Sequence, residues 1–178
     1  MLVTAGACVG SFANVVAWRL PREESVVWPG SHCPKCGQGV RWHDNVPVLG
    51  WIWLRGHCRD CHQGISSRYP LVELLSALLW LSAWWGHGLL AASDLLGLAF
   101  LNLLAGIVLV SVLLPLVLID IDHLWLPEPL CRLGVLLGFA FTGALYLVIP
   151  GQEASALLLN HLLAASAGLL ALEGLSAL

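Results

Sequence analysis

The sequence predicts an all-α polytopic membrane protein with about five transmembrane helices and a small cytoplasmic zinc-binding insert. Of the 178 residues, 58% are hydrophobic and only 11% are charged, whereas soluble domains carry about 25% charged residues. Several apolar stretches reach the roughly 17–25 residues that a helix needs to cross a bilayer. Four cysteines lie in the one segment that is rich in basic residues. These three observations together predict the fold class.

The apolar stretches divide the chain into three predicted domains. Residues 1–18 carry no charge and Arg19 ends the run, which predicts transmembrane helix 1. A cleaved signal peptide is the alternative, but its positive charge would precede the apolar stretch, and here the charge follows. Residues 19–69 form the cytoplasmic insert, and residues 70–178 form a membrane part of four helices. These four helices are expected near residues 70–86, 96–119, 132–149 and 154–176.

The distribution of basic residues predicts the orientation of the chain in the membrane. Seven of the eight Lys and Arg residues lie between Arg19 and Arg68, where four acidic residues leave a net charge of +3. Because cytoplasmic loops carry the excess of Lys and Arg, we expect the insert in the cytoplasm and the N-terminus outside. The lipid bilayer is thus one expected partner. The net charge of −3 for the whole chain gives no reason to expect nucleic acid.

Two C-x-x-C pairs in the insert predict a structural zinc site. Cys33 and Cys36 form the first pair, Cys58 and Cys61 form the second, and 21 residues separate them. The spacing is close to that of four-cysteine zinc sites, in which two tight turns present four thiolates to one tetrahedral ion. Two disulfides are the alternative, which a reducing cytosol disfavours. A thioredoxin-like redox pair lacks the βαβ pattern that would support it.

The remainder of the insert offers little material for a hydrophobic core. About fifty residues bury little apolar surface, so metal binding is expected to supply most of the folding free energy of this module. Residues 46–54, with Trp51 and Trp53, are expected to form apolar strand between the two pairs. No internal repeat of useful length is visible along the chain.

Acidic residues gather where the third apolar stretch ends. The segment 118–127 contains Asp120, Asp122 and His123, and charged groups at membrane depth are functional candidates. Asp120 and Asp122 can equally mark the point at which the chain enters water. On a continuing helix, residues i and i+2 do not face each other, so Asp120 and Asp122 are poorly placed to act as a catalytic pair. Four residues are alternatives for a second carboxylate: Asp122, Glu128, Glu73 and Glu173.

Taken together, these segments resemble the bacterial type IV prepilin peptidases, the leader peptidases/N-methyltransferases of pilus, type II secretion and competence systems. The resemblance rests on the order and spacing of five features: GSFANVVAWRLP at residues 10–21, the two cysteine pairs, RWHDNVP at 41–47, ISSRYPLVEL at 65–74, and residues 118–127. It implies an intramembrane aspartic protease of the bacterial inner membrane that cleaves the leader of a prepilin or pseudopilin on the cytoplasmic side. Asp120 stands seven residues before Pro127, at the position of the family's first catalytic aspartate. In bifunctional members the new N-terminus is then methylated with S-adenosylmethionine.

The sequence departs from the family pattern at its C-terminal end. The family's second catalytic aspartate lies in a Gly-x-Gly-Asp motif, and none occurs in these 178 residues. We therefore expect an incomplete peptidase that is inactive by itself. The alternative function is a non-catalytic, membrane-anchored zinc module that binds or scaffolds pilin-assembly partners. Polar groups within the spans, Asn14 and Glu73 among them, are expected to form interhelical hydrogen bonds rather than substrate contacts.

Overall fold

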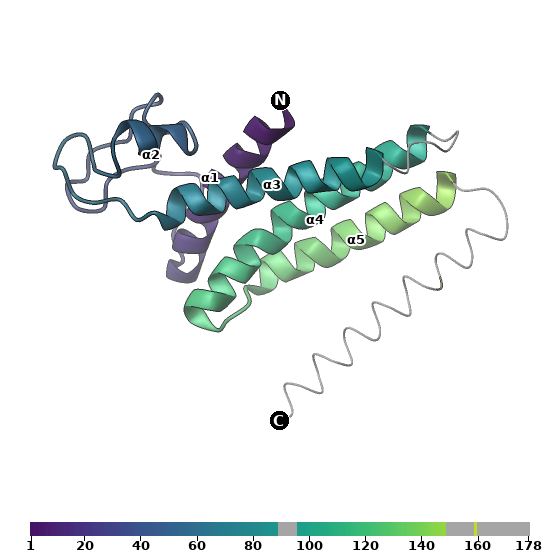
Figure 1. Ribbon diagram of the computed structural model, residues 1–178. Coiled ribbons are helices and arrows are strands. Elements are labelled where there is room, and N and C mark those ends of the chain that lie inside the picture. Colours follow the sequence, from purple (N-terminus) through teal and green to yellow (C-terminus); the bar gives the residue numbers. More distant parts are fainter. Residues whose placement is uncertain (89–95, 149–158, 160–178) are drawn as a thin grey trace.

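The computed structural model describes residues 1–88, 96–148 and 159. The chain begins with helix α1 (Leu2–Arg19) and a short 3-10 turn, η1 (Leu20–Arg22). The cysteine-bearing segment follows and contains only the five-residue helix α2 (Leu49–Trp53). Three long helices complete the described part of the chain: α3 (Arg68–Gly88), α4 (Leu96–His123) and α5 (Glu128–Val148). Figure 1 shows α3, α4 and α5 side by side, with α1 crossing α3 and the cysteine segment at one end of α3.

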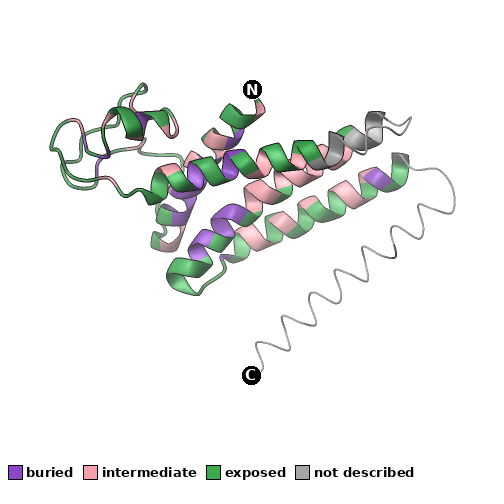
Figure 2. Ribbon diagram, viewed as in Figure 1, coloured by how far each residue is buried: buried purple, intermediate pink, exposed green. Residues whose placement is uncertain are grey.

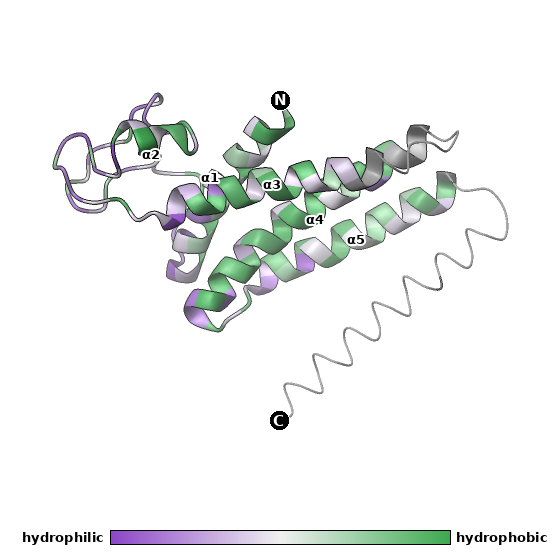
Figure 3. Ribbon diagram, in the orientation of Figure 1, coloured by the Kyte–Doolittle hydropathy of each residue, from purple (hydrophilic) through white to green (hydrophobic). Residues whose placement is uncertain are grey.

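Three of the described helices are long and apolar enough to cross a membrane. They are Leu2–Arg22, Phe100–His123 and Glu128–Leu147, and they coincide with the first, third and fourth predicted spans. Figure 3 shows the long apolar stretches of α4 and α5. The second predicted span forms helix α3, which has 21 residues but is not among the three candidates. The fifth predicted span, near 154–176, lies outside the described residues.

Small residues on α1 allow it to pack closely on α3. A Cβ atom on Gly10 would lie only 2.8 Å from Cα of Glu73 and 2.7 Å from Cβ of Ser76, so this crossing depends on glycine. The Ser76 hydroxyl donates to the carbonyl of Gly6 at 2.7 Å. The Asn14 side-chain amide donates to the carbonyl of Tyr69 at 3.2 Å, which confirms the predicted interhelical hydrogen bond for that residue. Close backbone approach with polar bonds is typical of helix pairs in membranes.

The hydrophobic core lies where α1, α3 and α4 meet. Its buried members are Ala13, Ala17, Val72, Leu114, Leu118 and Ile119. In Figure 2 the buried residues gather at this end of the bundle, while α5 is mostly exposed. Ile119 is completely buried, and Asp120 follows it directly. The core therefore fixes the turn of α4 that carries the predicted catalytic aspartate.

One local expectation was wrong. The expected strand 46–54 does not form, and its residues 49–53 form helix α2 instead, with the amides of Gly50 and Ile52 bonded to carbonyls four residues back, on Val46 and Val48. A short apolar run does not distinguish a helical turn from a strand by its periodicity. Helix α4 also continues past residue 119 and ends at His123, where Leu124 turns into the left-handed region with φ 49°. Asp120 and Asp122 consequently lie on a continuing helix, where residues i and i+2 do not face each other.

Candidate functional site

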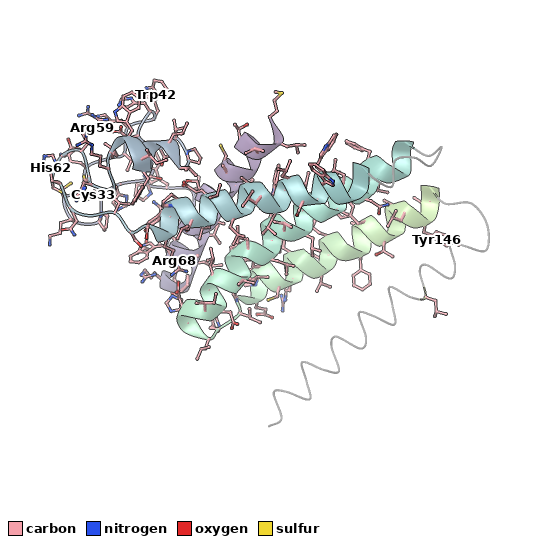
Figure 4. All side chains as sticks on the ribbon, viewed as in Figure 1. Cys33, Trp42, Arg59, His62, Arg68 and Tyr146 are labelled. Carbon is pink, nitrogen blue, oxygen red and sulfur yellow. The ribbon has the colours of Figure 1, made fainter. Side chains whose placement is uncertain are left out.

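The four cysteines of the two C-x-x-C pairs meet in one cluster. Their Sγ atoms all lie within 4.8 Å of one another. Cys33 and Cys58 are buried, whereas Cys36 and Cys61 lie at the surface. Figure 4 shows the cluster in the segment at the end of α3, near the labelled Cys33 and His62. The arrangement could hold one metal ion.

The distances fit a tetrahedral thiolate site and not a disulfide. Zn–S bonds of about 2.3 Å in a regular tetrahedron place neighbouring sulfurs about 3.8 Å apart, and the Sγ atoms of Cys33 and Cys61 are 3.8 Å apart. A disulfide requires about 2.05 Å, and all six cysteines are free. The donor set, four sulfurs with no open position, is the one that structural zinc sites use.

Each half of the cluster is built by the same eight-residue motif, a short repeat where none was expected. Residues 32–39 read HCPKCGQG and residues 57–64 read HCRDCHQG. In both, the first cysteine amide bonds to the glutamine carbonyl, Cys33 to Gln38 at 2.9 Å and Cys58 to Gln63 at 2.8 Å. In both, an isolated bridge joins the histidine to the glycine. The spacing of Gln and Gly after each pair was the signal that could have revealed this repeat.

Apart from the two residues between the cysteines, the two turns differ at one position, the residue after the second cysteine. Gly37 has φ 72° and the equivalent His62 has φ 55°. Both are left-handed, and the amide of each bonds back to the first cysteine carbonyl of its turn, at 2.9 and 3.0 Å. Glycine adopts this conformation without steric cost, whereas a residue with a Cβ does not. The second turn is thus held in a strained conformation by its surroundings.

Hydrogen bonds and crowding separate the pKa values of the two thiols of the first pair, Cys33 and Cys36. The backbone N–H groups of Cys36 and Lys35 lower the pKa of Cys33 to about 6. The N–H of Gln38 lowers the pKa of Cys36, but burial and the neighbouring thiols outweigh it and raise that pKa to about 12. Like charges this close cannot all form without a cation. A divalent metal would displace the remaining protons, because the thiolate is the ligand.

A partly buried ion pair between Arg59 and Asp44 supports the second turn from outside. Arg59 lies between Cys58 and Cys61 and donates two hydrogen bonds to the Asp44 carboxylate, Nε at 2.7 Å and Nη2 at 2.5 Å. The side chain of Asp44 is buried. The hydrogen bond from Arg59 holds the pKa of Asp44 below its ordinary value. This two-point contact fixes the turn by geometry as well as charge.

The predicted catalytic residue Asp120 lies on the last turn but one of α4 and is exposed. Among the residues that the structure describes, none forms a hydrogen bond or ion pair with its carboxylate. Asp122 differs: Arg68 of α3 binds both of its carboxylate oxygens, at 2.7 and 2.6 Å. Arg68 also reaches the carbonyl of Leu118 at 3.5 Å. Arg68 therefore contacts α4 at one position before Asp120 in the sequence and at one position after it.

The other proposed partners for Asp120 are engaged elsewhere. Glu73 is buried and accepts a hydrogen bond of 2.6 Å from the amide of Val48, so it does not form the predicted interhelical bond. Glu128 pairs with Arg132 one turn along α5. Glu173 lies outside the described residues. Helix geometry and ion pairing thus leave Asp120 without a carboxylate partner in the described part of the chain.

A cavity opens beside this end of α4. It has a volume of about 340 Å³ and lies between the ends of α1 and α4 and the start of α3. Trp18, Arg22, Tyr69 and the Arg68–Asp122 pair are among its lining residues. The cavity therefore combines aromatic and charged groups within one turn of Asp120.

Comparisons with known proteins agree with the motifs. A family model described as the bacterial peptidase A24 N-terminal domain matches residues 4–87. The chain is 42% identical, over 139 residues, to a prepilin leader peptidase/N-methyltransferase of Myxococcus xanthus, covering 78% of this chain and 38% of the relative. It is 40% identical to a type 4 prepilin-like proteins leader peptide-processing enzyme of Escherichia coli, covering 72% of this chain and 51% of the relative.

A third relative, the prepilin leader peptidase/N-methyltransferase of Pectobacterium carotovorum, is 37% identical over 76% of this chain and 53% of its own length. The chain thus spans about half the length, or less, of the curated relatives named here. No solved structure matches. The family match and these identities agree with the resemblance that the motifs indicated, and the chain belongs to the prepilin leader peptidase family.

Proposed function

We propose that this chain supplies the metal module and one catalytic carboxylate of an intramembrane aspartic peptidase that cleaves prepilin or pseudopilin leaders. The observation that carries the proposal is the contrast between two neighbouring aspartates on α4. Arg68 holds Asp122 at both oxygens, while Asp120 is exposed and has no partner among the described residues. A carboxylate kept clear of ion pairs is available to bind and activate a water molecule.

The chemistry requires a second carboxylate. An aspartic protease uses one ionised carboxylate as base and one protonated carboxyl as acid, and close approach of the two separates their pKa values. Asp122, Glu73 and Glu128 are each bound to another group. We therefore assign the second carboxylate to a residue outside the described part of this chain. We propose in addition that the chain alone does not cleave prepilins, because the Gly-x-Gly-Asp motif that carries the family's second aspartate does not occur in its 178 residues.

The cysteine module has a structural part in this proposal. Cys33, Cys36, Cys58 and Cys61 would hold one zinc ion, which would fold the module and perform no chemistry. The seven basic residues of the segment 19–68 support a cytoplasmic location for the module. The protein would then be a multi-pass protein of the bacterial inner membrane that meets its substrate at the cytoplasmic face.

Methylation of the cleaved pilin is proposed only from the names of the relatives. Several of them are called N-methyltransferases, and the family's methyl donor is S-adenosylmethionine. The described residues contain no strand and hence no glycine-rich loop that follows one. We accordingly assign no residue to this cofactor.

A cleavage assay tests the proposal. The 178-residue chain, reconstituted in membranes with a prepilin, should leave the substrate intact, while the Myxococcus xanthus relative serves as the active control. In an enzyme that contains both carboxylates, Asp120→Asn should abolish cleavage and leave one zinc per chain. Asp120→Glu is the matched variant, since it keeps the charge and moves it by one methylene. Full cleavage by the Asp120→Asn variant would overturn the assignment and favour a non-catalytic role for this part of the protein.

A further inference from the structure

Helix α2 turns an apolar face away from the protein. Leu49, Ile52 and Trp53 follow the i, i+3, i+4 spacing that places side chains on one face of a helix. They are 63%, 57% and 81% exposed. A helix of a small soluble module buries such a face against its own core. A group of large apolar side chains left exposed together indicates a contact surface.

The opposite face of α2 fixes this orientation. A Cβ atom on Gly50 would lie 2.1 Å from the carbonyl oxygen of Asp44, so the helix lies directly against that backbone. The Trp51 indole donates to the carbonyl of Ile65 at 3.0 Å and covers Gly56. Gly50 and Trp51 therefore face the cysteine module. The three apolar residues cannot turn inward without breaking these contacts.

A hydrogen bond sets the level of α2 along helix α3. Val48, which directly precedes α2, donates its amide to the buried carboxylate of Glu73 at 2.6 Å. Val48 adopts φ 61°, a conformation that is costly for a β-branched residue. Glu73 lies inside the predicted span 70–86, about 4.5 Å beyond its first residue at 1.5 Å per residue. Figure 1 likewise shows α2 beside the first turns of α3.

We propose that α2 inserts Leu49, Ile52 and Trp53 into the headgroup boundary of an anionic phospholipid bilayer. With α3 as the second membrane span expected from the sequence, the bond between Val48 and Glu73 holds α2 at the depth where interfacial helices lie, about 5–10 Å into the headgroup and acyl boundary. Tryptophan is enriched at that level. The net charge of +3 on residues 19–68 adds attraction to an anionic surface. The inference rests on the proposed membrane span and not on peptidase activity.

Fluorescence quenching by brominated lipids tests this contact. The full chain is reconstituted in phosphatidylethanolamine–phosphatidylglycerol vesicles, with and without bromine on the acyl carbons nearest the headgroup. Because the chain has nine tryptophans, the emission of Trp53 is obtained as the difference between the wild-type spectrum and that of Trp53→Phe. Trp42→Phe is the matched control, since Trp42 is 84% exposed and lies at the outer edge of the module in Figure 4. Far-UV circular dichroism verifies that both variants keep their helix content.

The expected result is a difference between the two tryptophans. Brominated lipid should remove more than half of the Trp53 emission and leave that of Trp42 unchanged, while aqueous iodide should quench Trp42 alone. Iodide quenching of Trp53 without lipid quenching would place α2 in water and overturn the proposal. Protection of Trp53 from both quenchers would indicate that protein covers this face, and would overturn it as well. Neither quenching measurement depends on prepilin cleavage. A failure of the proposed peptidase function is therefore distinguishable from a failure of this proposal.

Discussion

The cysteine module and the acidic end of α4 are two sites built on opposite plans. The module takes all four of its candidate ligands from residues 33–61 and brings their sulfurs within 4.8 Å. The end of α4 presents Asp120, whose carboxylate has no partner among the residues that the structure describes, and it is supported by Arg68 from α3. A metal centre of this kind is local in the sequence and complete once its turns form. A peptidase site shared between helices is complete only when all of its helices are present.

The largest expected effect is the loss of metal affinity on removing one cysteine of the four-cysteine cluster. Cys36→Ser leaves three thiolates and should lower metal affinity by more than about a hundredfold, beyond the roughly 10–100-fold cost of losing an outer partner. Because metal binding supplies folding free energy, amide exchange should rise across residues 31–65. Metal content per chain and hydrogen exchange measure both effects. Cys131→Ser, on α5, is the control and should keep its metal; equal loss in both variants would mean that the cluster is not the binding site.

A smaller loss of metal affinity is expected when the contact between Arg59 and Asp44, which supports the second turn, is removed. Asp44→Ala breaks the two hydrogen bonds to Arg59 and should lower metal affinity by about 10–100-fold, as loss of outer partners does. Competition with a chromophoric chelator measures this change. Asp60→Ala is the control from the same turn. Its contact with Arg41 is 3.7 Å long and exposed, and such pairs contribute about 0–1 kcal/mol.

The pH dependence of this variant follows from the depressed pKa of Asp44. A carboxyl whose pKa is lower in the folded state contributes its full stabilisation above the unfolded pKa, about 3.9, and loses it as the pH falls through the folded value. The ratio of the wild-type and Asp44→Ala affinities should therefore stay constant between about pH 6 and pH 8. A ratio that shrinks steadily over this range would show that a histidine or a thiol, and not Asp44, provides the support.

The same contrast explains what the sequence could and could not predict. The clustering of the four cysteines could be predicted because a C-x-x-C turn is determined by a few adjacent residues. The pairing of Arg68 with Asp122 joins residues 54 positions apart and depends on how α3 packs against α4. Glu73 was recognised as a polar group within a span, but its partner is the amide of Val48, which is available only through a positive φ. These two contacts depend on helix packing and on a strained backbone conformation, neither of which a sequence motif indicates.

A moderate loss of local stability is expected at the end of α4 when its contacts with Arg68 of α3 are removed. Arg68→Ala removes the ion pair with Asp122 and the contact with the Leu118 carbonyl. The pair is partly exposed, so we expect a loss of up to about 1 kcal/mol. Exchange of the Leu124 amide, which bonds to the Asp120 carbonyl, should therefore rise up to about fivefold. Arg132→Ala is the control; a similar rise in that variant would show that Arg68 does not specifically hold this turn.

Effects no larger than this are expected from substitutions at Gly37 and His62, which occupy the same position in the two turns of the candidate metal site. Gly37→Ala places a Cβ at φ 72°, and no atom lies within 4 Å of it, so its cost is conformational only, about 1 kcal/mol. His62→Gly relieves the same strain at φ 55° and should stabilise the metal-bound module by less than this, because glycine also loses more entropy on folding. Thermal unfolding with metal in excess measures both shifts, which should have opposite signs. Destabilisation by His62→Gly would mean that the imidazole itself stabilises the second turn, and that the two turns are equivalent in backbone conformation but not in how they are held.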